Sequence, residues 1–230
     1  MRPRVFAAAA ALASASLAAP TAASADAPIK PTVAIVGDSY AAGWTATTRN
    51  QSDAWWNYTA NDLGWRVTNV VADPGGGPIH IGDYGTFYQA LAAHPIPADT
   101  DYVLLQGGLN DSNDDPAAEA QAVEDDLTLI HTQAPNATPI VIGAFDPVPG
   151  HPYGVNQVAI ARHMGDYQAI HDTRYTIGFM CTFDTGPDFV HPTVAGYHQI
   201  GDWVAWHIAN GLDNGKPLHL DPTGSFYTTG

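Results

Sequence analysis

The stretch from Thr32 to Tyr40 constrains the fold of this chain most, because an apolar run in it stops abruptly at a Gly-Asp-Ser turn. Val33 to Val36 are apolar without interruption, and valine and isoleucine dominate the run. Such a run is typical of a strand buried on both faces of a parallel sheet. The turn ends in Ser39, and open α/β sheets place their chemistry at the carboxyl ends of their strands. The stretch therefore predicts a buried first strand followed by a candidate nucleophile.

Strand patterns and helix patterns alternate along the rest of the chain. This alternation predicts right-handed βαβ units and one parallel sheet of five strands covered by helices on both faces, which is the α/β class. Further strands are expected over residues 65–72, 101–106, 138–145 and 175–182. Helices are expected over residues 40–56 (interrupted by polar turns), 84–94, 116–130, 155–170 and 194–208.

The N-terminus has the pattern of a secretory signal peptide over residues 1–25. Arg2 and Arg4 precede an apolar, alanine-rich segment, and Ala23-Ser24-Ala25 fits the small-residue cleavage rule. We therefore expect an exported protein with one domain over residues 26–230, of which 213–230 form a loosely ordered tail. No later apolar run has the length of a membrane-spanning helix.

The charge of the chain narrows its partners. Only 8 Lys and Arg residues oppose 23 Asp and Glu residues, so the formal net charge is −15. Nucleic acids and anionic lipid surfaces need basic patches, so neither is an expected partner, and neutral substrates fit better. Cys181 is the single cysteine and is expected to be a buried structural residue at the end of a strand. We expect the mature protein to be a monomer.

Asp188 and His191 can supply the base that a serine nucleophile requires. They lie three residues apart ahead of the last helix, so both side chains can face the same side. Asp188 can then accept the Nδ1 proton of His191, which leaves Nε2 free to take the proton of Ser39. Pro192 suits the start of the helix that follows.

A serine hydrolase also needs hydrogen-bond donors for the oxyanion of its tetrahedral intermediate. Three candidates follow strands of the predicted sheet. They are the backbone N–H of Ser39, a backbone N–H in the glycine run 75–77, and the side-chain amide of Asn110. Glycines allow a close approach of backbone to substrate because they have no side chain.

These segments together resemble the four sequence blocks of the SGNH hydrolases, also called GDSL lipases and esterases. The resemblance extends from about residue 32 to about residue 208. The blocks are Gly37-Asp38-Ser39, a glycine after the second strand, Gly108-x-Asn110-Asp111 and Asp188-x-x-His191-Pro192.

The resemblance implies a flavodoxin-like three-layer α/β/α sandwich that hydrolyses esters, thioesters or acetylated sugars without a metal or cofactor. It implies Ser39 as nucleophile, His191 as base and Asp188 as the residue that orients the base. The implied oxyanion hole consists of the Ser39 N–H, a glycine N–H and Asn110. We select Gly76 for the glycine.

Two features depart from the family pattern. The second block usually ends in one glycine, whereas three follow Asp73-Pro74 here, so Gly75 and Gly77 remain alternatives to Gly76. Leu or Ile usually follows Gly-Asp-Ser, whereas this chain has Tyr40, which could line the pocket.

Other interpretations of single features are weaker. An α/β-hydrolase elbow would need glycine where Ala41 stands. The segment 111–115 begins like a calcium loop, but Pro116 and Ala122 stand where glycine and glutamate are needed. His80 and His151 could touch substrate, but both are expected to be ordinary surface histidines. Four tryptophans near the first crossover could stack on sugars, form an acyl pocket or belong to the core; they are Trp44, Trp55, Trp56 and Trp65.

The sequence therefore predicts a secreted serine esterase or lipase that acts on a neutral acyl ester, with an acyl lipid or a small acyl ester as substrate. A deacetylase of acetylated polysaccharide is an alternative. A non-catalytic module that binds carbohydrate or cell wall on the same fold is the alternative outside enzymes.

Overall fold

The computed structural model describes residues 29–145, 175–177, 183–209, 218–220 and 226–228. The predicted signal peptide, the predicted helix over 155–170, His151 and Cys181 lie outside the described residues, as does most of the tail after residue 209. Two short antiparallel strands of that tail are described, β6 (Leu218–Leu220) and β7 (Phe226–Thr228).

The core of the fold is a parallel sheet with the strand order β2-β1-β3-β4-β5. Every pair of neighbours is parallel, and β1 is buried along its whole length. The order changes direction at β1, so the loops after β1 and β3 diverge, and ligands bind at such switch points in open α/β sheets. The strands are β1 (Thr32–Gly37), β2 (Arg66–Ala72), β3 (Tyr102–Gln106), β4 (Thr138–Ile142) and β5 (Tyr175–Ile177).

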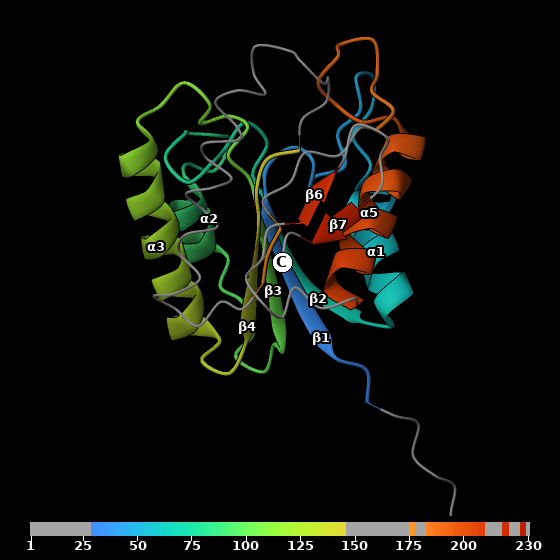
Figure 1. The fold of residues 1–230 in the computed structure, drawn as a ribbon. Coiled ribbons are helices and arrows are strands. Elements are labelled where there is room, and N and C mark those ends of the chain that lie inside the picture. The colour runs from blue at the N-terminus through green and yellow to red at the C-terminus, as the bar shows by residue number, and fades with distance from the viewer. Residues whose placement is uncertain (1–28, 146–174, 178–182, 210–217, 221–225, 229–230) are drawn as a thin grey trace, which may run out of the picture.

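Helices cover both faces of this sheet, as predicted. The helices α1 (Trp55–Leu63) and α5 (Val194–Ala209) lie on one face, and α2 (Phe87–Ala93) and α3 (Pro116–Gln133) lie on the other (Figure 1). Alternate residues of β1 enter two separate apolar clusters, with Ile35 on the α1/α5 side and Val36 on the α2/α3 side. No helix in these described ranges is long and apolar enough to cross a membrane.

Local sequence signals account for where two of these helices begin. Asp115 caps α3 by accepting the Ala117 N–H, and Pro116 occupies the first helical position, where its missing N–H costs nothing. Thr86 and Gln89 form a reciprocal capping box at the start of α2.

The predicted helix over residues 40–56 is wrong. The chain instead forms turns and a short 3₁₀ helix, η1 (Gln51–Asp53), before α1 starts at Trp55. Gly43 has a φ of 70°, which belongs to the left-handed region, and a Cβ there would lie 2.1 Å from the Asn50 carbonyl oxygen. A loop that folds back on itself this closely therefore replaces the first helical turns.

Candidate active site

Ser39 lies in a tight turn directly after β1, at the carboxyl end of the sheet. The Asp38 carboxylate accepts the Tyr40 N–H at 2.8 Å, and the Asp38 carbonyl accepts the Ala42 N–H at 3.1 Å. The Ser39 carbonyl accepts the Trp44 N–H at 3.0 Å. These bonds hold the hydroxyl of Ser39 at the edge of the core.

Asp188 and His191 occupy a second loop, residues 184–193, just before α5. The Asp188 Oδ1 atom accepts the backbone N–H groups of Val190 and His191, each at 3.1 Å. The other carboxylate oxygen, Oδ2, lies 2.8 Å from Nδ1 of His191. Phe189 between them has a φ of 57°, which is uncommon for a residue with a side chain. The turn thus orients both side chains toward the same side, as the spacing predicts.

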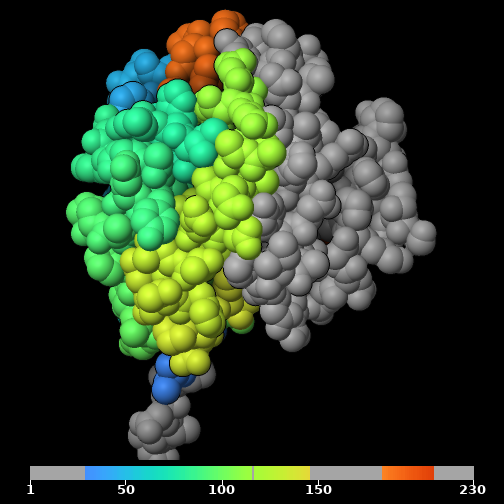
Figure 2. Space-filling view, turned by 90° about the vertical axis from the view of Figure 1, so that its left-hand side faces the viewer, coloured from blue at the N-terminus to red at the C-terminus, as the bar shows by residue number. Residues whose placement is uncertain are grey.

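The structure brings the two loops together. Nε2 of His191 lies 3.1 Å from Oγ of Ser39, although the residues are 152 positions apart in sequence. Figure 2 shows the chain after β1 (blue) and the chain before α5 (orange) side by side at the top of the molecule. Hydrogen-bond contacts therefore run from Asp188 through the imidazole of His191 to Ser39.

The charge of Asp188 is favoured by its surroundings. Partial burial raises the pKa of this carboxyl, but hydrogen bonds from the His191 ring and from the N–H groups of Val190 and His191 outweigh it and lower the pKa overall. Asp188 is therefore an anion at neutral pH, which is the state needed to orient a protonated Nδ1.

Tyr40 does not line the cavity, so the expectation that it would is wrong. Its side chain is 1% exposed, and its ring lies in the core among Phe145 and Phe183. Its hydroxyl donates to the carbonyl oxygen of Val190 at 2.5 Å. Tyr40 therefore links the loop that contains Ser39 to the loop that contains His191.

The glycine run begins in a turn that is held by a hydrogen bond from the loop after β3. Asp73 to Gly76 form a turn in which the Gly76 N–H donates to the Asp73 carbonyl at 2.9 Å and Gly75 has a φ of 76°. Pro74 and Gly75 at the central positions are typical of a type II turn. The side-chain amide of Asn110 donates to the Gly76 carbonyl at 2.8 Å.

Asp111 holds the same glycine loop further along. Its Oδ1 atom accepts the N–H groups of Ile79 and His80 at 2.9 and 2.8 Å. A Cβ on Gly77 would lie 1.8 Å from the other carboxylate oxygen, so any side chain there would displace the Asp111 carboxylate. This contact gives Asp111 and Gly77 a structural role, and it brings the β2 and β3 loops to one site.

Several carboxyl groups behind the site are buried in the interior. Burial raises the pKa of Asp38 to about 7, and repulsion from Asp111 adds to the effect, although the Tyr40 N–H opposes it. Burial, with repulsion from Asp111 and Asp114, raises the pKa of Glu119 on α3 to about 9. Asp38 next to Ser39 and Glu119 on α3 are both buried, and in this they differ from Asp188, which is partly exposed.

A cavity of about 420 Å³ opens over the Ser39 hydroxyl, which is in the size range of small-ligand sites. Gly75 lines it, whereas Gly76 does not. Trp44, one of the four tryptophans that the sequence left open between substrate binding and the core, lines it as well, and Asp83 is a lining residue that the sequence did not predict. The full lining is Ser39, Trp44, Pro74, Gly75, Asp83, Leu109, Asn110, Ser112, Val190 and His191.

The four tryptophans near the first crossover separate into different environments. Trp55 and Trp56 are buried in the core, and Trp65 stacks on Tyr102 with ring centroids 4.4 Å apart. Trp44 alone among these four lines the cavity. His80, expected at the surface, is exposed and lies 3.8 Å from Asp114.

Metal-binding side chains do not gather in the described ranges. Within them, no group of three or more His, Cys, Asp or Glu residues could hold a metal ion.

Comparison with known proteins gives a family match. The model of the GDSL-like lipase/acylhydrolase family matches residues 35–199, which includes every residue of the site described above. A search of curated protein sequences found no relative of the chain.

Solved structures with the same fold include carbohydrate esterases and a lipase-like protein. An active-site mutant of a family two carbohydrate esterase from Clostridium thermocellum has a TM-score of 0.60 at 15% identity, over 81% of this chain and 65% of that one. A family 2 carbohydrate esterase with a carbohydrate-binding domain from Corynascus thermopiles has a TM-score of 0.61 at 21% identity, over 83% of this chain and 68% of that one.

A putative GDSL-like lipase from Bacteroides uniformis has a TM-score of 0.58 at 16% identity. That match covers 79% of this chain and 96% of the lipase. This chain therefore spans about two thirds of each of the two carbohydrate esterases and nearly all of the lipase-like protein.

Proposed function

Because the chain belongs to the GDSL-like lipase/acylhydrolase family, we propose that it is a carboxylic ester hydrolase, and more narrowly an exported serine esterase with Ser39 as its nucleophile. The observation that carries this proposal is the hydrogen-bond chain from Asp188 Oδ2 through His191 to Ser39 Oγ, with contacts of 2.8 and 3.1 Å. These lengths are within the range for a nucleophile, its base and the group that orients the base.

The reaction proceeds through an acyl-enzyme. Nε2 of His191 takes the Ser39 proton while Oγ attacks the ester carbonyl, and Asp188 stabilises the imidazolium that forms. His191 then gives the proton to the leaving alkoxide, which departs as the alcohol. Water, deprotonated by the same Nε2, attacks the acyl-enzyme. The carboxylic acid is released as His191 returns that proton to Oγ of Ser39.

Three donors are proposed for the oxyanion: the Ser39 N–H, the Gly75 N–H and the Asn110 amide. We select Gly75 over Gly76 because Gly75 lines the cavity and its N–H takes no part in the turn bond, whereas the Gly76 N–H donates to Asp73. Asn110 donates one of its two amide hydrogens to Gly76, so the other remains for the substrate. Removing one such donor costs about 10²–10³-fold in kcat in other serine hydrolases.

Export and a neutral substrate are part of the same proposal. The signal-peptide pattern over residues 1–25 supports secretion, and the net charge of −15 disfavours anionic partners. An acyl lipid and a small acyl ester both remain substrates of the proposed enzyme. Removal of acetyl groups from polysaccharide is a second candidate, favoured by the carbohydrate esterases that share the fold.

Replacing Ser39 with alanine tests the proposal. We expect the hydrolysis of p-nitrophenyl acetate to fall at least about 10⁴-fold, because a triad nucleophile has no substitute. Ser112→Ala is the matched control, since Ser112 lines the same cavity without the His191 contact, and it should keep activity within about tenfold.

Covalent labelling gives an independent measurement. A fluorophosphonate should add its mass to the peptide that contains Ser39 in the wild type and in Ser112→Ala, and should not label Ser39→Ala. Full activity of Ser39→Ala, or the absence of labelling in an active preparation, would contradict the proposal that Ser39 is the nucleophile. A wild type that shows neither hydrolysis nor labelling would favour a carbohydrate-binding module.

A further inference from the structure

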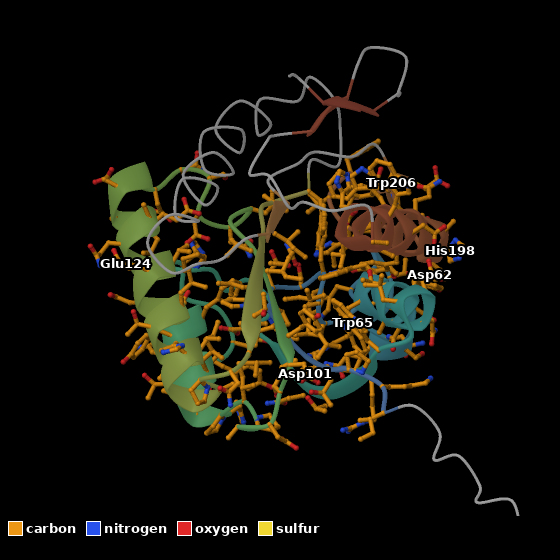
Figure 3. The ribbon with its side chains drawn as sticks, turned by 60° about the horizontal axis from the view of Figure 1, so that its bottom comes forward. Asp62, Trp65, Asp101, Glu124, His198 and Trp206 are labelled. Atoms are coloured by element: carbon orange, nitrogen blue, oxygen red, sulfur yellow. The ribbon has the colours of Figure 1, made fainter. Side chains whose placement is uncertain are left out.

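Trp44 lines the catalytic cavity and is 36% exposed, which separates it from the tryptophans near it in sequence. Trp55 and Trp56 are 0% and 7% exposed, so they pack in the core. Trp65 directly precedes β2 and lies at the amino end of the strands, which faces the viewer in Figure 3. Of these four rings, therefore, only that of Trp44 can touch a substrate bound over Ser39.

The position of Trp44 is fixed relative to the nucleophile. The backbone N–H of Trp44 donates to the Ser39 carbonyl at 3.0 Å, and the backbone carbonyl of Trp44 accepts a hydrogen bond from the hydroxyl of Tyr197 on α5. Trp44 also forms an isolated antiparallel β-bridge with Arg49. The Thr45 N–H donates to the Thr48 carbonyl at 2.7 Å, which closes the loop after Trp44. These contacts fix the backbone of Trp44, so a ligand that binds its ring does not first have to order the loop.

The Trp44 ring lies beside the His191 ring, and this contact identifies which half of a bound ester, acyl or alcohol, lies next to Trp44. The centroids of the Trp44 and His191 rings are 5.8 Å apart, with the planes tilted by 40°. The leaving oxygen must come within reach of Nε2 of His191 to receive its proton. The alcohol half of the ester therefore passes Trp44, and the carbonyl oxygen lies away from it, toward Gly75 and Asn110.

The chemistry around this position suits an uncharged ring that carries hydroxyl groups. A flat indole face packs against the C–H face of a saturated ring, and the exposed carboxylate of Asp83, which lines the same cavity, can accept hydrogen bonds from hydroxyls. The same carboxylate and the net charge of −15 repel a phosphate group.

We propose that Trp44 is the residue that selects the alcohol half of the substrate, and that this half is a neutral sugar ring. The proposal rests on the serine esterase function proposed above, and it names the substrate class at that same site. The ester that fits is an acyl group on a sugar hydroxyl, rather than a phospholipid.

Two esters with the same acyl group test this inference. Ethyl acetate has a small acyclic alcohol, and an acetylated methyl xylopyranoside has a sugar ring. In Trp44→Ala we expect kcat/KM for the sugar acetate to fall about tenfold or more, mainly through KM, because the stacking surface is lost. The value for ethyl acetate should stay within about threefold, and Trp44→Phe, which keeps a flat ring, should recover part of the loss.

Trp206→Ala is the matched control, because this tryptophan on α5 is 42% exposed but does not line the cavity (Figure 3). It should leave both values unchanged. An equal fall for both esters in Trp44→Ala, or no fall for the sugar acetate, would overturn the assignment of Trp44. A Ser39→Ala variant that still hydrolyses ethyl acetate would instead overturn the proposal that Ser39 is the nucleophile of a serine esterase, so the two failures are distinguishable.

Discussion

The two loops that meet at the site are held in different ways. The nucleophile loop, residues 38–44, continues a fully buried strand, and Tyr40, Ala41 and Ala42 in it are at most 1% exposed. The base loop, residues 184–193, is more open, and Phe189 in it is 66% exposed. The core thus fixes the nucleophile, whereas a few hydrogen bonds fix the base, so changes in the two loops should affect different properties.

Two aspartates make the contrast sharper. Asp38 is 1% exposed, and burial raises its pKa to about 7. Asp188 is partly exposed, and its hydrogen bonds to His191 and Val190 outweigh the effect of burial and lower its pKa. We infer that Asp188 contributes to catalysis through its charge, whereas the charge of Asp38 acts on stability.

The largest expected effect is that of Asp188→Asn on turnover. Oδ1 of Asp188 already accepts two backbone N–H groups, so the asparagine oxygen will keep that position and its NH₂ group will face Nδ1 of His191. Nδ1 must then accept, which puts the ring proton on Nε2, where it cannot take the Ser39 proton. We expect kcat for p-nitrophenyl acetate to fall about 10³–10⁴-fold with little change in fold.

Asp38→Asn is the comparison for that experiment. The amide oxygen can still accept the Tyr40 N–H, so kcat should stay within about tenfold. Similar losses of kcat in the two variants, with circular dichroism spectra unchanged, would contradict the division of roles between the loops.

The sequence predicts the frame of the molecule well, for identifiable reasons. A strand buried on both faces has an unbroken apolar run, which makes β1 visible, and Asp115-Pro116 marks the start of α3. The rule that parallel strands end at one edge predicts that Ser39 and His191 meet, and the structure brings them to hydrogen-bond distance. The catalytic roles of these residues stay predictions.

The remaining features depend on backbone geometry or on long-range contacts. The choice between Gly75 and Gly76 follows from the type of turn, which three successive glycines do not specify. The contact of Tyr40 with Val190 joins residues 150 positions apart, and no local pattern encodes it. A left-handed turn at Gly43 stands where the sequence predicts a helix, and Trp44, directly after this turn, lines the cavity.

The second effect is a change in the pH dependence of stability in Asp38→Asn. The folded pKa of about 7 is above the ordinary value of 3.8, so between these pH values the folded state binds more protons than the unfolded state. Stability from this group is therefore full below about pH 4 and is lost as the pH rises to about 7. The loss approaches about 4 kcal/mol, at about 1.4 kcal/mol per pKa unit.

Urea denaturation at pH 4.5 and 7.5 measures this change. Asp38→Asn should unfold at a higher urea concentration relative to the wild type at pH 7.5 than at pH 4.5, because asparagine has no charge to bury. Glu119→Gln should show the same behaviour over a range that extends from about pH 4.5 to about pH 9, since burial raises the pKa of Glu119 to about 9. If the free energy of unfolding changes equally with pH in Asp38→Asn and in the wild type, Asp38 does not titrate in this range.

The smallest expected effects are those of removing two tyrosine hydroxyls, one that bonds to the base loop and one that bonds to the nucleophile loop. Tyr40 donates to Val190 in the base loop, whereas Tyr197, whose pKa burial raises so that it stays a donor, bonds to the Trp44 carbonyl. Loss of one hydrogen bond costs about 1 kcal/mol, so each phenylalanine variant should lose at most about tenfold in rate. Tyr40→Phe should lower kcat for ethyl acetate and for the sugar acetate alike, because it loosens the base.

Tyr197→Phe should act on KM for the sugar acetate rather than on kcat. It loosens the support of Trp44 and leaves His191 in place, so KM for the sugar acetate should rise while kcat for ethyl acetate stays within about twofold. If both variants lower kcat by the same factor on both esters, the two loops move as one unit, and the nucleophile loop is not the rigid partner that its burial indicates. If the effects separate, the tyrosine hydroxyls divide the site into one part that positions the base and one that positions the alcohol.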